Sequence, residues 1–396
     1  MKYLQAMKIA LISHLYPTKL FPHQGKFIQD QFELLNEDPG NEVDLIVPTP
    51  HAIPYTGRWK ASKSELLCES DQSFRVRYLS FPKRRFSGFI QRSLSKQMLR
   101  FLLKKQYDIV HVHWAYPDGL LIPDLKKSGF KTVLTIHGSD WYQTKDTPVL
   151  SELIKESLFK ADRVLYSGPK LKQDIEKRFP ELRLKSDIIY NMVDTDAYKP
   201  ASTAEKISLR KKLNWDDSKT HLLTVASLRP EKGVDLLVET ITGNKALSDI
   251  CFHIIGNSEN TGHSQKILKS IKENPFNNID FNSPVSPNEL IKYYQASDFY
   301  VLPSRREGFN VSILEAASCG LPLVCTDVGG NKEVIDKGTG ILSNKIKDLD
   351  PSGILTMSKE YSGYKPESLN KIIKENYGKS TFLNNLLSNY RLSLNS

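Results

Sequence analysis

The chain has 396 residues, of which 39% are hydrophobic and 25% charged, and it carries a net charge of +10 at neutral pH. This length predicts two domains of nearly equal size, and the composition excludes a disordered chain. The four cysteines form no C-x-x-C pair, which argues against a zinc site or disulfide framework and for the reducing cytoplasm. No apolar run approaches the ~20 residues that span a bilayer, and no cleavable leader is recognisable, so we expect a protein that does not cross a membrane.

The first expected element is a continuous apolar strand over residues 7–13, followed by a loop over 14–25 and a helix from about Lys26. A buried strand followed by a helix is typical of a doubly wound parallel sheet. Further strands are expected over 43–47 and 74–81. The first loop lacks G-x-G-x-x-G, so the dinucleotide-binding fingerprint is absent.

Basic residues concentrate in the segment 83–105, which has eight Lys or Arg and no Asp or Glu. In the helix expected over 86–104, apolar residues recur every four positions: Ile90, Leu94, Met98 and Leu102. Cations occupy roughly the opposite side of that helix: Arg92, Lys96, Arg100 and Lys104. This pattern indicates contact with anionic lipid head groups. It also fits a helix whose apolar side packs on the domain core while its basic side is solvated.

Two later strands, expected over 108–113 and 131–136, each bring a histidine to their carboxyl end, His113 and His137. That edge faces the crevice in an open α/β sheet. A structural role is the alternative for each histidine. A metal site is not expected, because no Cys or carboxylate stands at ligand spacing. A strand over 161–167 closes the first half.

The second half begins with another strand, over 222–228, and a loop that carries Arg229 and Lys232 before a helix from Val234. Two cations beside the free amides of a helix N-terminus form a site for a diphosphate. Solvated loop cations are the alternative. A further strand and turn are expected over 252–256.

The most informative stretch is 305–322, which follows a short apolar strand over 299–302 and contains a helix over about 311–318. Glu307 stands at the strand-to-helix turn, and Glu315 follows eight residues later. Two helical turns separate such residues, so the two carboxylates could face the same way. The amides of residues 308–311 would be free to meet an anion.

Glu307-x7-Glu315, with Gly308-Phe309, Gly320-x-Pro322 and Gly329-Gly330-x-x-Glu333, closely resembles the signature of the retaining GT-B glycosyltransferases of family four, also called glycosyl transferases group 1. The resemblance implies an α/β fold of GT-B architecture, with two Rossmann-like doubly wound parallel-sheet domains facing a central cleft. It implies an acceptor-binding domain over 1–192 and a nucleotide-sugar-binding domain over 193–365. A helical segment over 366–396 would cross back to the first domain.

The resemblance also implies roles for individual residues. Glu307 would bind the hydroxyls of the donor sugar and Glu315 those of the ribose. His137, followed by Gly138-Ser139 as in the family, would orient the sugar or the acceptor, with His113 and Asp140 as candidate acceptor-site residues. The implied donor-binding set is Gly25, Arg229, Lys232, Gly308, Phe309, Asn310, Val311 and Glu315. Gly25 is equally well explained as a plain turn glycine.

One position departs from the family, which often has an arginine where Ser227 stands. Either Arg229 substitutes for that arginine or the contact is missing. Two D-x-D sequences also resemble a metal-binding motif of the other large glycosyltransferase fold, but Asp194 to Asp196 lie in a linker and Asp348 to Asp350 in a surface loop. We therefore expect no metal and no other cofactor.

The expected activity is transfer of a sugar from a nucleotide diphosphate donor, a UDP- or GDP-sugar, to a hydroxyl of a glycan or lipid-linked acceptor, in bacterial envelope or capsule polysaccharide synthesis. The expected location is the cytoplasm, with peripheral contact at the inner face of the membrane. Rival readings are a nucleotide-sugar epimerase, a glycan phosphorylase, whose pyridoxal lysine motif is not found, and a basic nucleic-acid-binding protein. No nucleic-acid-binding motif accompanies the charge, so no nucleic acid partner is expected.

Overall fold

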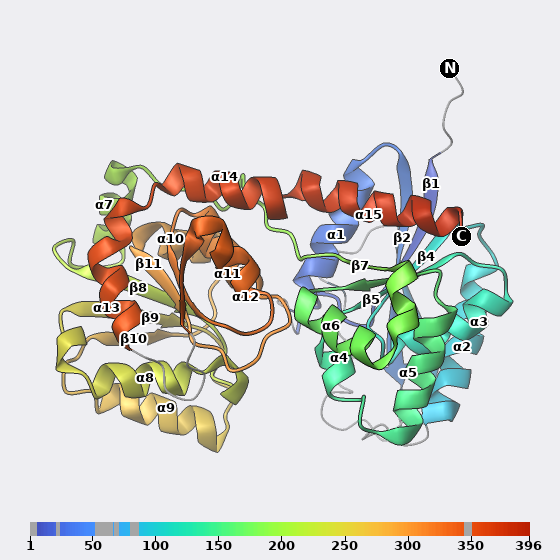
Figure 1. Ribbon diagram of the computed structural model, residues 1–396, viewed down its shortest axis with the longest axis horizontal. Coiled ribbons are helices and arrows are strands. Elements are labelled where there is room, and N and C mark those ends of the chain that lie inside the picture. The colour runs from blue at the N-terminus through green and yellow to red at the C-terminus, as the bar shows by residue number, and fades with distance from the viewer. Residues whose placement is uncertain (1–5, 21–23, 52–65, 67–70, 80–86, 344–350) are drawn as a thin grey trace. The chain divides into compact units, whose positions relative to one another are not determined.

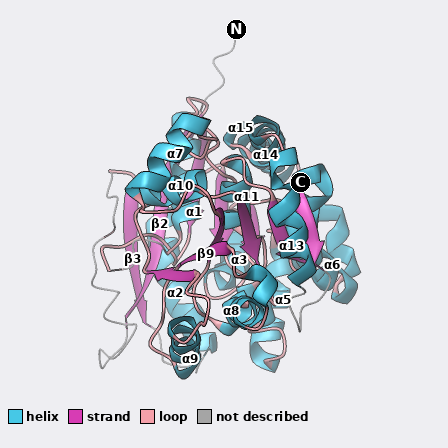
Figure 2. Cartoon of the chain, turned by 90° about the vertical axis from the view of Figure 1, so that its left-hand side faces the viewer, coloured by secondary structure: helices cyan, strands magenta, loops and turns pink. Residues whose placement is uncertain are grey.

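The computed structural model describes residues 6–20, 24–51, 66, 71–79, 87–343 and 351–396. The chain divides into two compact units: Met1–Tyr190 together with Leu383–Ser396 form unit 1, and Asn191–Phe382 form unit 2. Each unit consists of one sheet with helices around it (Figures 1 and 2). Unit 2 is therefore a contiguous segment, whereas unit 1 is completed by the end of the chain.

Unit 1 contains a seven-stranded sheet of order β3-β2-β1-β4-β5-β6-β7. Every pairing between its described strands is parallel. The strands are β1 Met7–Ile12, β2 Asn41–His51, β3 Ser73–Leu79, β4 Ile109–His113, β5 Thr132–Ile136, β6 Arg163–Tyr166 and β7 Ser186–Ile188. The helices are α1 Lys26–Glu37, α2 Ser87–Leu102, α3 Ile122–Lys127, α4 Ser139–Tyr142, α5 Pro148–Lys160 and α6 Pro169–Arg178, with the short 3₁₀ segments Asp118–Leu121 and Pro180–Lys185.

Unit 2 contains a six-stranded sheet of order β10-β9-β8-β11-β12-β13, and its described strands also pair in parallel. The strands are β8 Thr220–Val225, β9 Ile250–Ile255, β10 Ile279–Asn282, β11 Phe299–Leu302, β12 Leu323–Thr326 and β13 Gly340–Ser343. The helices are α7 Thr203–Lys212, α8 Val234–Thr242, α9 Gly262–Lys272, α10 Pro287–Ala296, α11 Val311–Ser318, α12 Asn331–Val334, α13 Pro351–Glu360 and α14 Pro366–Tyr377. The last helix, α15 Lys379–Leu394, begins in unit 2 and ends in unit 1.

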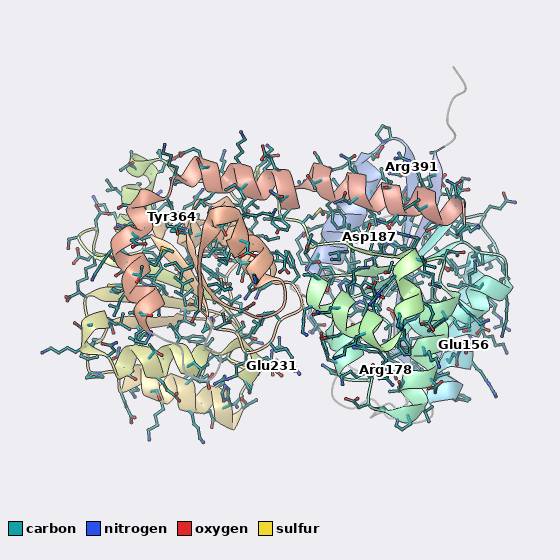
Figure 3. All side chains as sticks on the ribbon, viewed as in Figure 1. Glu156, Arg178, Asp187, Glu231, Tyr364 and Arg391 are labelled. Atoms are coloured by element: carbon teal, nitrogen blue, oxygen red, sulfur yellow. The ribbon has the colours of Figure 1, made fainter. Side chains whose placement is uncertain are left out.

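Both sheets have a core on each face, as the unbroken apolar strands predicted. The last four residues of β1, Ile9 to Ile12, and all of β11 are fully buried. In each unit, side chains fill the space between the sheet and its helices (Figure 3). Strands buried on both faces are typical of parallel sheets with helices on either side.

The strand order reverses at one place in each sheet, between β1 and β4 in unit 1 and between β8 and β11 in unit 2. The loops at the carboxyl ends of such strands diverge and leave room for a ligand. All the candidate residues in strand-end loops, from His113 to Glu307, come from the ends of these strands or of their neighbours.

The apolar side of helix α2 is buried. Ile90, Leu94, Met98 and Leu102 are all buried in the core of unit 1, with at most 1% of each side chain exposed. The cations Arg92, Lys96, Arg100 and Lys104 are exposed. The apolar side therefore packs on the domain core and is not available for insertion into lipid. Residues 83–86 of the basic segment lie outside the described residues.

The end of the chain is tied into unit 1 by polar contacts. Tyr390 in α15 lies 2.7 Å from Nδ1 of His111 in β4. Asn389 accepts two hydrogen bonds from Arg163 in β6, at 2.7 and 3.1 Å. The division between the units falls after Tyr190 and after Phe382, so α14 belongs to unit 2, whereas the sequence grouped residues 366–396 together.

Candidate functional site

Two loops of unit 2 meet at the point where its strand order reverses. The loop after β8 leads through residues 226–233 into α8, and the loop after β11 leads through 303–310 into α11. Gly233 has a φ of +66°, and a Cβ atom there would lie 1.9 Å from the carbonyl oxygen of Pro303. Only glycine permits this approach, because any side chain would collide with backbone. The sequence thus brings the two loops into direct contact.

A double ion pair reinforces this contact. Both terminal nitrogens of Arg305 donate to Asp235 in the first turn of α8, each at 2.7 Å. The amide of Arg305 also donates to the carbonyl of Glu231 at 2.8 Å. A bidentate arginine–carboxylate pair fixes direction as well as distance. Arg305 therefore holds the loop that carries Lys232 against the loop that carries Glu307.

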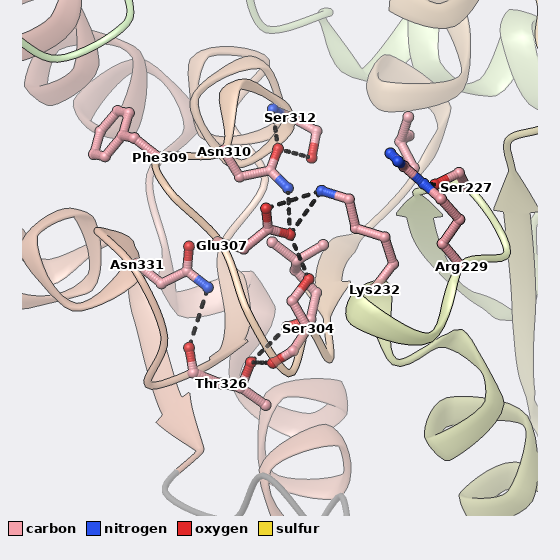
Figure 4. A network of polar contacts seen from close by, with 12 residues as sticks. Ser227, Arg229, Lys232, Ser304, Glu307, Phe309, Asn310, Ser312, Thr326 and Asn331 are labelled. Carbon is pink, nitrogen blue, oxygen red and sulfur yellow. Dashed lines mark hydrogen bonds and ion pairs between the residues drawn. The ribbon is translucent and has the colours of Figure 1, made fainter. Parts of the chain in front are cut away.

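Glu307 is the centre of a polar network (Figure 4). Lys232 Nζ lies 2.8 Å from its Oε1 and 2.9 Å from its Oε2. Ser304 Oγ and Asn310 Nδ2 donate to Oε1 at 2.6 and 3.0 Å. Only 8% of the Glu307 side chain is exposed, and 21% of Lys232. A buried carboxylate with three donors is held in one orientation, which suits a residue that must meet a substrate at a defined place.

Glu307 lies in the turn before α11, as expected, so helical periodicity does not decide whether it faces the same way as Glu315. Helix α11 begins at Val311, and its N-cap is Asn310, whose side-chain oxygen accepts from the amide of Ser312 at 2.9 Å. Asn310 therefore has two roles: its side-chain oxygen caps α11, and its side-chain nitrogen donates to Glu307. The direction of Glu307 is set by its partners in the loops and not by helical periodicity.

Glu315 does lie on α11, half-buried, and has a partner that the sequence did not indicate. The hydroxyl of Tyr294, in α10, donates to its Oε2 at 2.9 Å. Tyr294 is fully buried, and burial together with the nearby Glu315 raises the pKa of its phenol well above the usual value. The phenol therefore stays protonated and can act as a fixed donor to the carboxylate.

The other residues expected at the donor site line the same turn. Phe309 is almost completely buried; its ring packs near Tyr377 at 5.5 Å and occupies the space that a side chain at Gly330 would need. The carbonyl of Gly308 accepts from the amide of Gly330 at 3.1 Å. Val311 is the first residue of α11. Gly308, Asn310 and Val311 thus lie at the helix N-terminus as expected, while the Phe309 ring serves the packing of the turn.

Arg229 reaches back to the position where the family arginine was expected. Its Nε donates to Ser227 Oγ at 3.0 Å, and the residue is exposed (Figure 4). The guanidinium therefore lies beside Ser227 on the same loop that carries Lys232.

In unit 1, the two candidate histidines are in direct contact. His113 Nδ1 lies 2.9 Å from His137 Nε2, and the rings stack with their centroids 5.2 Å apart. Burial lowers the pKa of His137 to about 3, and the nearby His14 adds to the shift. Burial also lowers the pKa of His113 well below its usual value. Both rings are therefore neutral at physiological pH and act through hydrogen bonds rather than charge.

Asp140 fixes the backbone around these histidines. One of its oxygens accepts from the amide of Ala115 at 2.6 Å, and the other from the amides of His137 and Trp141, each at 3.2 Å. Burial raises its pKa to about 6, although these amide donors oppose the shift. Its contacts are those of a residue that joins the ends of β4 and β5.

The backbone conformation at position 25 requires a glycine. Gly25 has a φ of +70°, and a Cβ atom would lie 2.5 Å from the carbonyl oxygen of Leu15. It is also the N-cap of α1. The start of α1 therefore lies directly against the loop after β1.

One residue of that loop, His14, pairs with Asp118, and the sequence did not single out this pair. His14 Nδ1 lies 2.8 Å from Asp118 Oδ2, and the His14 amide donates to the same oxygen at 2.7 Å. Asp118 is fully buried. Both residues follow the carboxyl ends of strands, β1 and β4, and that position was the one signal in the sequence that could have found them.

Of the two D-x-D sequences, Asp194 to Asp196 lie within the described residues. Asp194 accepts from the amides of Asp196 and Ala197 and from Lys379 Nζ, the last at 2.7 Å, so it organises the linker. Asp348 to Asp350 and Cys68 lie outside the described residues. Within the described ranges, no group of three or more His, Cys, Asp or Glu is arranged to hold a metal ion.

No described helix is long and apolar enough to cross a membrane.

Two family models match the chain. The model of the family described as Glycosyltransferase Family 4 matches residues 33–197, and that of Glycosyl transferases group 1 matches residues 205–349. The chain is 26% identical over 351 residues to an Escherichia coli UDP-Gal:α-D-GlcNAc-diphosphoundecaprenol α-1,3-galactosyltransferase, which covers 86% of the chain and 85% of that protein. It is 26% identical over 260 residues to the N-acetyl-α-D-glucosaminyl L-malate synthase of Bacillus anthracis, 63% of the chain.

The chain spans 65% of the length of that synthase and 61% of another curated relative. Among solved structures, sucrose-phosphate synthase from Thermosynechococcus elongatus superposes with a TM-score of 0.77 at 18% identity, covering 97% of this chain and 98% of that one. The two family models cover most of both units, and the whole fold matches: the chain belongs to the GT-B glycosyltransferases of family 4, the glycosyl transferases group 1.

Proposed function

We propose that the chain transfers a hexosyl group from a nucleotide diphosphate sugar, a UDP- or GDP-sugar, to a hydroxyl of a glycan or lipid-linked acceptor, with retention of anomeric configuration and without a metal ion. The observation that carries this proposal is the placement of Lys232 and Glu307 on two adjoining loops at the N-termini of α8 and α11. The naming of UDP-Gal and a lipid-linked acceptor for the E. coli relative supports these substrate classes.

In this proposal the diphosphate binds at the mouth of the two helices. Lys232, Arg229 and the amides of residues 308–311 would meet its negative charge, because free amides and cations together form an anion site. Glu315, held by Tyr294, would bind the ribose hydroxyls. Glu307 would bind the hydroxyls of the donor sugar, and His137 in unit 1 would orient the sugar or the acceptor.

The reaction breaks the bond between the sugar C1 and the diphosphate oxygen, and the electron pair leaves with the nucleotide. A new bond forms between C1 and the acceptor oxygen, whose proton passes to the departing diphosphate. Negative charge grows on that diphosphate in the transition state, so fixed cations and amide dipoles there lower the barrier. Nothing in this sequence of steps requires a metal ion.

The test is thermal stabilisation and turnover with UDP-, GDP- and ADP-sugars in the presence of EDTA, for the wild type and Glu307→Gln. Stabilisation by one donor, with turnover that persists in EDTA and is lost in the variant, supports the proposal. Formation of the epimeric nucleotide sugar without an acceptor would identify an epimerase instead. If no nucleotide sugar stabilises the protein, the proposal fails.

The exposed cations of α2 favour a second property, peripheral contact with an anionic membrane. Because the apolar side of this helix is buried, the contact would be electrostatic, without insertion of that side, and should weaken with salt. This is consistent with a lipid-linked acceptor in envelope or capsule polysaccharide synthesis. Sedimentation with vesicles of phosphatidylglycerol, and not of phosphatidylcholine, at low salt is expected. Binding to duplex DNA without vesicle binding would contradict it.

A further inference from the structure

The pair formed by His14 and Asp118 lies at the ligand edge of unit 1 and has no role in the mechanism above. Asp118 is fully buried, and its Oδ2 accepts from both the amide and Nδ1 of His14. A carboxylate oxygen accepts hydrogen bonds, so Nδ1 is the donor to Asp118; in that tautomer of the imidazole, Nε2 carries the lone pair. Asp118 thereby fixes both the tautomer and the orientation of the ring.

The outer nitrogen of this ring is available. About 23% of the His14 side chain is exposed, and no described residue forms a hydrogen bond with Nε2. The loop that carries it is held beneath α1 by the close approach of Gly25 to Leu15. A histidine with one nitrogen anchored on a buried carboxylate and the other exposed presents a fixed hydrogen-bond acceptor to a ligand.

The His14 ring adjoins an aromatic cluster through Trp114. Trp114 packs edge-on against His14 with the ring centroids 5.6 Å apart, and Phe27 lies 6.0 Å from Trp114 and 4.9 Å from His137. Phe27 is half-buried at the start of α1. An aromatic face beside a fixed polar atom suits a sugar ring, which has an apolar C–H face and hydroxyl groups around its edge.

We propose that His14 Nε2 accepts a hydrogen bond from a non-reacting hydroxyl of a pyranose ring in the acceptor, with Phe27 forming part of the face against which that ring packs. This rests on the proposed function, since it assigns the acceptor side of the same transfer. It makes His14 a specificity-determining residue: an acceptor that lacks this one hydroxyl leaves the anchored nitrogen without a partner. The rejection of such analogues is then built into unit 1, independently of the donor site in unit 2.

The test is saturation-transfer NMR with methyl α- and β-pyranosides of glucose, galactose, mannose and N-acetylglucosamine, and with monodeoxy analogues of any that binds. The wild type is expected to bind at least one glycoside, and one monodeoxy analogue about tenfold more weakly. His14→Phe should bind the parent glycoside as weakly as that analogue, with no further loss on removal of the hydroxyl. Phe27→Leu should weaken every glycoside.

Phe159→Leu is the matched control, because Phe159 is a partly exposed phenylalanine on α5; it should bind as the wild type does. Glycoside binding by His14→Phe at the wild-type level overturns the proposal, as does the absence of binding by the wild type. If His14→Phe does not fold, the glycoside binding of Phe27→Leu is the deciding measurement. Binding by Phe27→Leu at the wild-type level also overturns the proposal. Thermal stabilisation by UDP is measured in parallel and is expected in all variants; its absence in the wild type would defeat the donor proposal separately.

Discussion

Lys232 Nζ lies within 2.9 Å of both carboxylate oxygens of Glu307, so the same ammonium that we assign to the donor diphosphate is already bonded to the residue that we assign to the donor sugar. A diphosphate that binds Lys232 must compete with this carboxylate. In this assignment Glu307 would have two opposing effects, weakening nucleotide binding while positioning the sugar.

This relationship makes a specific prediction for Glu307→Gln. Transfer should fall by at least about 100-fold, because an interaction that strengthens in the transition state is lost. The affinity for UDP should rise several-fold, because Lys232 is released from a competing charge. Calorimetric titration with UDP and turnover with the preferred donor measure the two effects. Glu231→Gln, at an exposed pair with Arg306, is the control and should change neither. Weaker UDP binding by Glu307→Gln would contradict the competition.

Tyr294→Phe should act through Glu315. Removing the hydroxyl frees the carboxylate that we assign to the ribose, so UDP should bind roughly 3- to 10-fold more weakly. The affinity for 2′,3′-dideoxy-UDP should be the same in variant and wild type, because that nucleotide has no ribose hydroxyls for Glu315 to bind. Tyr293→Phe, one residue earlier on α10 and half-buried, is the control. An equal loss for both nucleotides would instead mean that Tyr294 is only structural.

Gly233→Ala should disrupt the contact between the two loops of unit 2. The added Cβ would lie 1.9 Å from the Pro303 carbonyl oxygen, so the loops must separate. Gly338 has a similar backbone conformation, with a φ of +82°, but open space around the position of a Cβ. Gly338→Ala should therefore lose only about 1 to 2 kcal/mol for its conformation.

Gly233→Ala should lose more, on the order of 3 kcal/mol or above, together with stabilisation by UDP. Urea unfolding of the two variants measures the difference. Equal losses in both would show that the close approach to Pro303 has no energetic weight.

Unit 1 should lose stability in mild acid. The pKa values of His111 and His137 are lowered by burial to about 3, so between pH 3 and 6.5 the unfolded chain binds more protons than the folded one. The contribution of these neutral, buried histidines to the free energy of unfolding is fully present above pH 6.5. It is lost as the pH falls, at up to about 1.4 kcal/mol per pH unit for each histidine. Asp140, with its pKa raised to about 6, has the opposite effect and gains stability as the pH falls from 6 to 4.

Urea unfolding at pH 7, 6 and 5, followed by tryptophan fluorescence in a Trp215→Phe background, reports on unit 1, which then holds all the remaining tryptophans. The free energy of unfolding should fall with pH, and Asp140→Asn should fall more steeply because the opposing group is gone. A free energy that does not change between pH 7 and 5 would contradict the assignment of neutral, buried histidines.

Much of this organisation could be read from the sequence, because it depends on local patterns. The apolar run at β11 and the helix at α11 were predicted at residues 299–302 and 311–318, where they are found. The GT-B fold was implied by the glutamate motif and is matched by known structures. These features depend on residues close together in the chain, where hydrophobic pattern and capping are decisive.

The partners of the site residues could not be predicted in this way. Tyr294 and Glu315 are 21 residues apart, His14 and Asp118 104 residues apart, and Lys232 and Glu307 75 residues apart. Such pairs are set by the strand order, which brings distant loops to one edge. For the related reason, helical spacing could not predict the direction of Glu307, because the loop that carries it is fixed by contacts with residues distant in the chain.

The interleaving of the two units has a consequence for biosynthesis. Residues 191–382 form unit 2 without interruption, whereas in unit 1 one of the partners of His111, besides Gln31 and Thr135, is Tyr390 near the end of the chain. During translation, unit 2 emerges whole and is free to fold first. The Tyr390 hydroxyl, which contacts the buried imidazole of His111, is encoded almost 280 codons after His111. A premature stop codon in the last helix would therefore damage unit 1, most of which leaves the ribosome first, and would spare unit 2, which is synthesised later.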